Sequence, residues 1–120
     1  MRFLAADYTK PLDVPERSTD LLISLFAGPV WDNCRRYLRP GGLLLANTSH
    51  GDASLAALEP SLRLVAAAHH SNGRYRLATE GLGEYLIPKR ADAADGERIR
   101  SSGRGIAYTR SAFAYLFQVD

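Results

Sequence analysis

The feature that most constrains the fold is a pair of apolar runs separated by a short amphipathic segment. The first run covers residues 20–26 and has five large apolar residues in seven, without alternation. This pattern is typical of a parallel strand that is covered on both faces. The second run, Leu43 to Ala46, follows Pro40-Gly-Gly42, and between the two runs one helical stripe collects Val30, Cys34, Tyr37 and Leu38. A short helix between two buried strands predicts a parallel crossover and hence an α/β fold.

The rest of the chain carries weaker secondary-structure patterns. We expect further strands at residues 2–6, 62–68, 74–78 and 112–119, and helices at residues 52–58 and 79–86. Asn72-Gly73 predicts a hairpin turn between two of these strands. Residues 91–104 are rich in Asp, Arg, Gly and Ser, which predicts a mobile surface loop. In the last strand we expect one face to carry Phe113, Tyr115 and Phe117.

Length and composition predict one soluble globular domain, residues 1–120, with a single core. No apolar run approaches the roughly 18 residues of a membrane span, and the first residues lack the layout of a signal peptide, so we expect a cytoplasmic protein. The net charge of +2 gives little reason to expect a polyanionic partner. His69 and His70 are adjacent on a predicted strand and point to opposite faces, so no metal site is predicted.

The two runs, Asp20-Leu-Leu-Ile-Ser24 and Leu38-Arg-Pro-Gly-Gly42, resemble at this spacing the carboxyl-terminal part of a class I S-adenosylmethionine-dependent methyltransferase. The resemblance implies a truncated, partial Rossmann-like sheet of that type, mostly parallel, with an antiparallel carboxyl-terminal strand. It begins at the family's third strand, so the family's first two strands and its Gly-rich cofactor loop have no counterpart. Gly41-Gly42 does not replace the loop, because a cofactor loop follows a strand and opens a helix.

The resemblance implies S-adenosylmethionine as cofactor and methyl transfer to an unknown acceptor, as a fragment of a longer enzyme. In this family, the positions of Asp7 and Tyr8 hold adenine. The positions that line the methionine and methyl site are those of Ser24, Leu25 and Phe26. Base-amine methyltransferases carry Pro-Pro and an aromatic residue after this strand, and the sequence lacks that motif. Without the Gly-rich loop we expect the isolated chain to bind the cofactor weakly.

Polar residues follow the second strand of the crossover, where ligands bind in such sheets, and Asn47, Ser49 and Asp52 are candidate substrate residues. His50 is the candidate general base, and Asp52 could orient it. Alternatively, Asn47, Ser49 and Asp52 form turns and cap the next helix. Further along, a candidate substrate loop contributes Arg104 for an anion and Tyr108 for stacking or hydrogen bonding. A plain connection into the last strand explains that loop equally well.

A second function class is a catalytically inactive, methyltransferase-like binding or dimerisation module. The missing strands would leave the strand at residues 20–26 with an unpaired edge, and unpaired apolar edges favour pairing with another chain. A homodimer through this edge is therefore expected in that case. Trp31, Tyr75 and Tyr85 have arginines nearby, as in nucleic-acid stacking surfaces, but their scatter over several elements favours ordinary packing.

Overall fold

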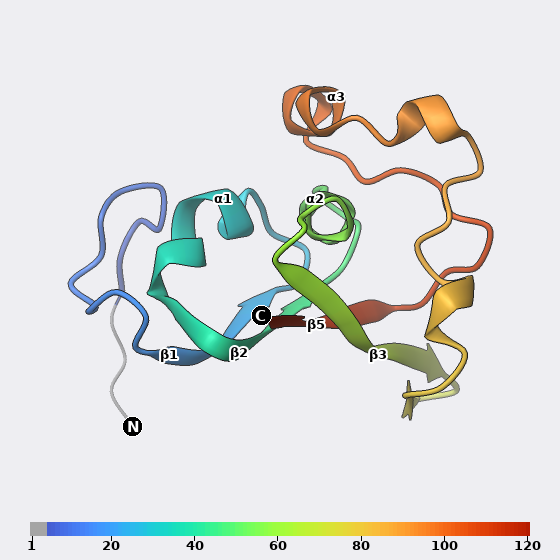
Figure 1. Cartoon of the computed structure of the whole chain (residues 1–120), viewed down its shortest axis with the longest axis horizontal. Helices are drawn as coiled ribbons and strands as arrows, with labels where there is room; N and C mark the ends of the chain where they lie inside the picture. Colours follow the sequence, from blue (N-terminus) through green and yellow to red (C-terminus); the bar gives the residue numbers. More distant parts are fainter. Residues whose placement is uncertain (1–4) are drawn as a thin grey trace.

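The computed structural model describes residues 5–120 as one five-stranded sheet with three α-helices (Figure 1). The strands are β1 (Thr19–Ser24), β2 (Leu38–Ala46), β3 (Leu62–Ser71), β4 (Arg74–Ala78) and β5 (Ala114–Val119). The α-helices are α1 (Val30–Cys34), α2 (Asp52–Ala57) and α3 (Gly96–Ser102). Short 3₁₀ helices are η1 (Arg35–Tyr37), η2 (Leu82–Glu84) and η3 (Ala91–Ala93).

The strand order is β1-β2-β5-β3-β4. The parallel pairing of β1 with β2 confirms the predicted crossover through α1 and the α/β class. The expectation of a mostly parallel sheet is wrong, because the other three pairings within residues 5–120 are antiparallel. The reason is topological: β5 returns between β2 and β3 and opposes both, and β4 folds back on β3 at the predicted Asn72-Gly73 turn.

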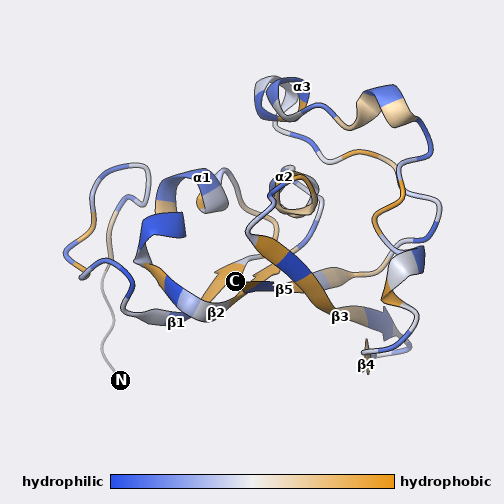
Figure 2. Cartoon of the chain, in the orientation of Figure 1, coloured by the Kyte–Doolittle hydropathy of each residue, from blue (hydrophilic) through white to orange (hydrophobic). Residues whose placement is uncertain are grey.

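The helices all lie on one side of the sheet (Figure 1). Side chains that alternate along the strands face these helices and form the core, and Figure 2 shows apolar residues along the strands beneath α1 and α2. The main core includes Trp31, Leu44, Ala46, Ala53, Tyr115 and Phe117. The opposite face is open at β1, where Leu21 is 44% and Ile23 is 55% exposed. The prediction that this strand is covered on both faces is therefore wrong.

Two predictions for the middle of the chain are wrong. Residues 79–86 form only the short helix η2, because Gly81 adopts a positive φ of 65° and Gly83 adds flexibility. The predicted loop at residues 91–104 contains α3 instead. The Asp95 carboxylate accepts hydrogen bonds from the backbone N–H groups of Glu97 and Arg98, and the one apolar residue of this helix, Ile99, is buried. The Asp95 cap and the buried Ile99 side chain are enough to stabilise this short helix because α3 also packs on α2.

Residues 5–18, which precede β1, pack against α1 instead of joining the sheet. The Leu12 backbone N–H donates to the Tyr37 hydroxyl (2.7 Å), and a small cluster forms from Tyr8, Leu12, Val14, Val30, Cys34 and Tyr37. The strand predicted at residues 2–6 lies largely outside the described residues, and Ala5 and Ala6 are not in a strand. Within residues 5–120, no strand pairs with the outer edge of β1.

Candidate functional site

Three loops meet at the carboxyl ends of the parallel strands β1 and β2. The Phe26 backbone N–H donates to Asn47 Oδ1 (3.1 Å), which joins the loop after β1 to the loop after β2. The Gly105 backbone N–H donates to the Thr48 carbonyl oxygen (2.9 Å), which joins the loop before β5 to the same place. Ligands bind at the carboxyl ends of strands in open α/β sheets, so this crevice is the candidate functional site.

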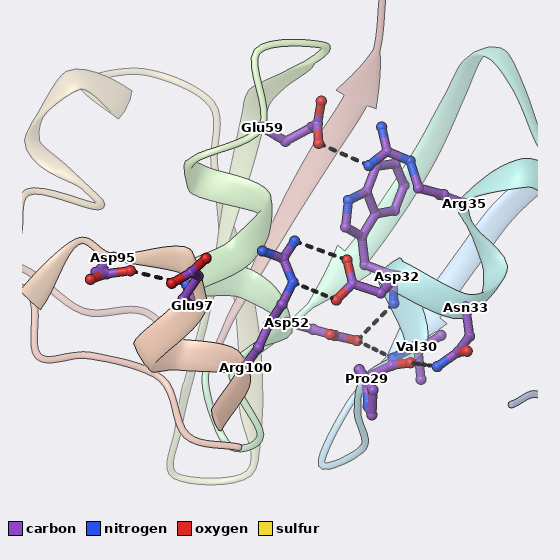
Figure 3. A network of polar contacts seen from close by, with 11 residues as sticks. Pro29, Val30, Asp32, Asn33, Arg35, Asp52, Glu59, Asp95, Glu97 and Arg100 are labelled. Carbon is purple, nitrogen blue, oxygen red and sulfur yellow. Dashed lines mark hydrogen bonds and ion pairs between the residues drawn. The ribbon is translucent and has the colours of Figure 1, made fainter. Parts of the chain in front are cut away.

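Asp52 is the buried centre of the crevice (Figure 3). Its Oδ2 atom accepts hydrogen bonds from Ser24 Oγ (2.5 Å) and from the backbone N–H groups of Val30 (2.9 Å) and Trp31 (3.1 Å). The carboxylate therefore caps α1, although Asp52 itself begins α2, and it fixes the end of β1 to both helices. Its Oδ1 atom has no hydrogen-bond partner among the described residues.

His50 lies on the rim of a cavity of about 330 Å³ between α1, α2 and α3. The cavity is bordered by Gly28 and by the Arg100–Asp32 ion pair, in which the guanidinium donates twice, at 2.8 and 3.1 Å (Figure 3). No hydrogen bond joins the exposed His50 to Asp52 in the described part of the chain, and Asp52 instead holds Ser24 and the start of α1.

The other predicted substrate residues divide into buried and exposed groups. Asn47 is buried, and its Oδ1 accepts from the Phe26 and Ser49 backbone N–H groups, as in the alternative turn interpretation. The buried Tyr108 hydroxyl donates to Ser54 Oγ (2.9 Å), and burial raises the pKa of this phenol. Ser49 and Arg104 are exposed, and the Arg104 backbone packs against Gly51.

One side chain joins the predicted adenine segment to the loop that carries the predicted methyl positions. The Tyr8 hydroxyl reaches the loop that follows β1 and donates to the Gly28 carbonyl oxygen (3.2 Å). Asp7 is exposed, and hydrogen bonds to its Oδ1 from the Thr9 hydroxyl and backbone N–H lower its pKa. Ser24 is fully buried and Leu25 half-buried, whereas Phe26 is 62% exposed at a positive φ of 55°. This φ is uncommon for a residue other than glycine.

No family model, curated protein or solved structure matches this chain. The assignment of function therefore depends on the residues and the geometry described above. No helix within residues 5–120 is long and apolar enough to cross a membrane. Over the same range, no three His, Cys, Asp or Glu side chains gather closely enough to hold a metal ion.

Sequence reasoning missed a cluster of aromatic rings beside the crevice. Phe26 packs against Phe113 with ring centroids 6.0 Å apart, and Phe113 in turn contacts the rings of His70 and Tyr75. Phe113 thus lies outside the core that holds Tyr115 and Phe117, contrary to the expected shared face. The Asn72-Gly73 turn could have paired His70 with Tyr75 from sequence, but only the tertiary fold adds the two phenylalanines.

The surroundings of His69 lead us to expect that the stability of the fold depends on pH. Burial, together with Arg76 and Arg110, lowers the pKa of His69, whose Nε2 lies 2.6 Å from the Tyr85 hydroxyl. The unfolded chain, in which this pKa is about 6.5, then binds the proton more readily than the folded chain does. We expect the free energy of unfolding to be highest above about pH 6.5. It should decrease as the pH is lowered from there to the folded-state pKa, and the decrease should level off below that pKa. Urea unfolding at about pH 7.5 and pH 5.5 measures this.

His69→Gln should make the free energy of unfolding less dependent on pH over this interval, because glutamine does not titrate. His50→Gln is the control, since His50 is exposed and the substitution should leave stability nearly unchanged. An equal pH dependence in His69→Gln and in the unmodified chain would contradict the prediction.

Proposed function

We propose that this chain is the carboxyl-terminal part of an S-adenosylmethionine-dependent methyltransferase whose sheet is partly Rossmann-like. The observation that carries the proposal is the contact between Tyr8 and Gly28. It joins the segment that the resemblance assigns to adenine with the loop that it assigns to the methyl group. The crossover β1-α1-β2 and the reversed strand β5 give further support, because both are expected from the same resemblance.

The residues fit the cofactor better at its adenine end than at its methionine end. Both hydrogen bonds from Thr9 go to Asp7 Oδ1, so within the described residues Asp7 Oδ2 is free to accept one from an amino group. The Ser24 hydroxyl is engaged by Asp52, which leaves only backbone groups of the Ser24–Phe26 turn for the methionine end. This division agrees with weak binding by a chain that lacks the Gly-rich loop.

Methyl transfer requires little chemistry from the protein beyond alignment. When bound, S-adenosylmethionine supplies an activated methyl group. Residues of the crevice hold the acceptor in line with it and exclude water, which is the main source of acceleration for such a displacement. His50, on the rim of the crevice, takes the proton that an oxygen or nitrogen acceptor loses. The buried Asp52 keeps the loops on both sides in place.

Calorimetric titration with S-adenosylmethionine and S-adenosylhomocysteine tests the proposal. We expect saturable binding that Asp7→Ala weakens by roughly ten- to a hundredfold, the worth of one hydrogen bond to a charged group. Asp13→Ala is the matched control, because Asp13 is an exposed carboxylate of the same segment. The proposal is wrong if no heat is detected at millimolar cofactor, or if Asp7→Ala binds as tightly as the unmodified chain.

The open edge of β1 favours a second candidate, an inactive module that forms a homodimer. Two copies related by a two-fold axis can pair their β1 strands in antiparallel fashion, which satisfies backbone groups that no described strand pairs with. The exposed side chains of Leu21 and Ile23 would become partly covered. A dimeric mass in light scattering, together with no cofactor binding, would favour this candidate over the enzyme.

A further inference from the structure

The aromatic cluster beside the crevice has the geometry of a ring-binding surface. His70 and Tyr75 stack with centroids 4.3 Å apart and an angle of 13° between their planes. The Phe113 ring meets both of them edge-on, at 5.6 and 5.8 Å. Tyr75 is 66% exposed although it belongs to this stack, so much of its ring is available to a further aromatic group.

The surroundings of this cluster are cationic. A hollow of about 760 Å³ at the β3–β4 hairpin is lined by His69, His70, Ser71, Asn72, Arg74, Tyr75 and Arg76. None of these residues is acidic. In the described part of the chain no carboxylate lies within ion-pair distance of Arg74 or Arg76, whereas Arg110 nearby is paired with Glu84. Arg74 and Arg76 alternate with Tyr75 along β4, so they line the hollow from the other face of the hairpin. The hollow therefore complements a ligand whose negative charge extends beyond the ring that stacks on Tyr75.

The cluster also reaches the loop assigned to the methyl group. Phe26 belongs to that loop, and its ring packs on Phe113, which packs on Tyr75. A ligand ring stacked at Tyr75 would thus lie on an aromatic surface that leads directly to the carboxyl end of β1. A hollow of this volume suits a small molecule, and the net charge of +2 is low for a nucleic-acid binder.

We propose that the hollow at the β3–β4 hairpin binds a planar aromatic molecule with an anionic group, and that this molecule is the methyl acceptor. The second part rests on the proposed methyltransferase function. In the transfer, a lone pair of the acceptor's hydroxyl or amino group forms a bond to the methyl carbon of S-adenosylmethionine. The carbon–sulfur bond breaks, its electron pair stays on sulfur, and the acceptor's proton leaves to water.

Hydroxynaphthoate is the probe, because its fluorescence reports binding without any cofactor. Naphthol, which lacks the carboxylate, and cyclohexanecarboxylate, which lacks the ring, are the comparison ligands. We expect saturable binding of hydroxynaphthoate that is at least tenfold tighter than that of either comparison ligand. Tyr75→Ala should weaken it about tenfold, as expected for loss of one stacked ring. Arg74→Gln with Arg76→Gln should weaken hydroxynaphthoate and leave naphthol unchanged.

Leu77→Ala is the matched control, because Leu77 is equally exposed, on the same strand, but outside the lining of the hollow. All these side chains are exposed, so the variants should fold, which circular dichroism checks. Equal losses in Leu77→Ala and Tyr75→Ala, equal affinity for naphthol, or tighter binding of a short single-stranded oligonucleotide would overturn the inference.

The failure of this inference is distinguishable from failure of the proposed function. Cofactor binding without probe binding would overturn the hollow as a ligand site and leave the methyltransferase proposal intact. Probe binding with the expected variant pattern, but no cofactor binding, would support the hollow as a ligand site and overturn its assignment to a methyl acceptor. Incubation of both ligands with the chain, followed by mass spectrometry of the probe, tests methylation directly.

Discussion

Replacing Asp52 with alanine is expected to lower the free energy of unfolding by about 3–5 kcal/mol, a large part of the 5–15 kcal/mol typical of a domain. The substitution removes the acceptor for the buried Val30 and Trp31 backbone N–H groups. It also removes the shorter hydrogen bond of Ser24 Oγ, which can still donate to the Ala27 carbonyl oxygen (3.2 Å). Each buried donor that loses its partner costs about 1–3 kcal/mol. The loss is large because no other described acceptor is bonded to the start of α1.

Asp52→Asn separates hydrogen bonding from packing. Asparagine has nearly the same shape as aspartate and retains one carbonyl oxygen. Asp52→Asn should therefore lower the free energy of unfolding by only about 1–2 kcal/mol, because neutral hydrogen bonds are weaker than those to a carboxylate. Asp13→Ala, at an exposed position, should stay within about 0.5 kcal/mol of the unmodified chain. Urea unfolding measures all three variants. A loss below about 1 kcal/mol in Asp52→Ala would contradict the role of Asp52 as the link between β1 and both helices.

Replacing Gly105 with alanine is expected to lower the free energy of unfolding by about 2–3 kcal/mol. An added Cβ would lie 2.6 Å from Thr48 Cβ and closer still to the Thr48 carbonyl oxygen. Because backbone atoms cannot move aside as a flexible side chain can, the loop before β5 must shift. The shift would break the hydrogen bond from the Gly105 backbone N–H to Thr48 and open the crevice on the side of His50.

Gly83→Ala is the control for this substitution. A Cβ at Gly83 would meet no atom within 4 Å, and Gly83 has no positive φ, so alanine there should be neutral or slightly stabilising. Thermal unfolding compares the two variants, and hydrogen exchange at residues 48–51 reports whether the loop has shifted. Equal melting temperatures for Gly105→Ala and Gly83→Ala would show that the loop is not packed as described.

Elements formed by neighbouring residues could be predicted from the sequence. Two apolar runs around one amphipathic segment gave β1, α1 and β2, and Asn72-Gly73 gave the β3–β4 hairpin. These predictions succeeded because apolar runs, helix periodicity and turn geometry depend on residues close in the chain. The sequence also predicted that polar residues 47–52 lie at the carboxyl end of β2, because they follow that strand directly in the chain.

Only the tertiary structure decided which distant segments meet. The insertion of β5 between β2 and β3 made the sheet mostly antiparallel. One face of β1 is open because the helices lie on the other side of the sheet (Figure 1). The insertion of β5 also placed Phe113 against Phe26 and Tyr75. Because α1 packs on α2, Asp52 caps α1, and among the described residues it forms no hydrogen bond to His50. Contacts between segments far apart in the chain depend on strand order. Local patterns specify the strands themselves but not their order.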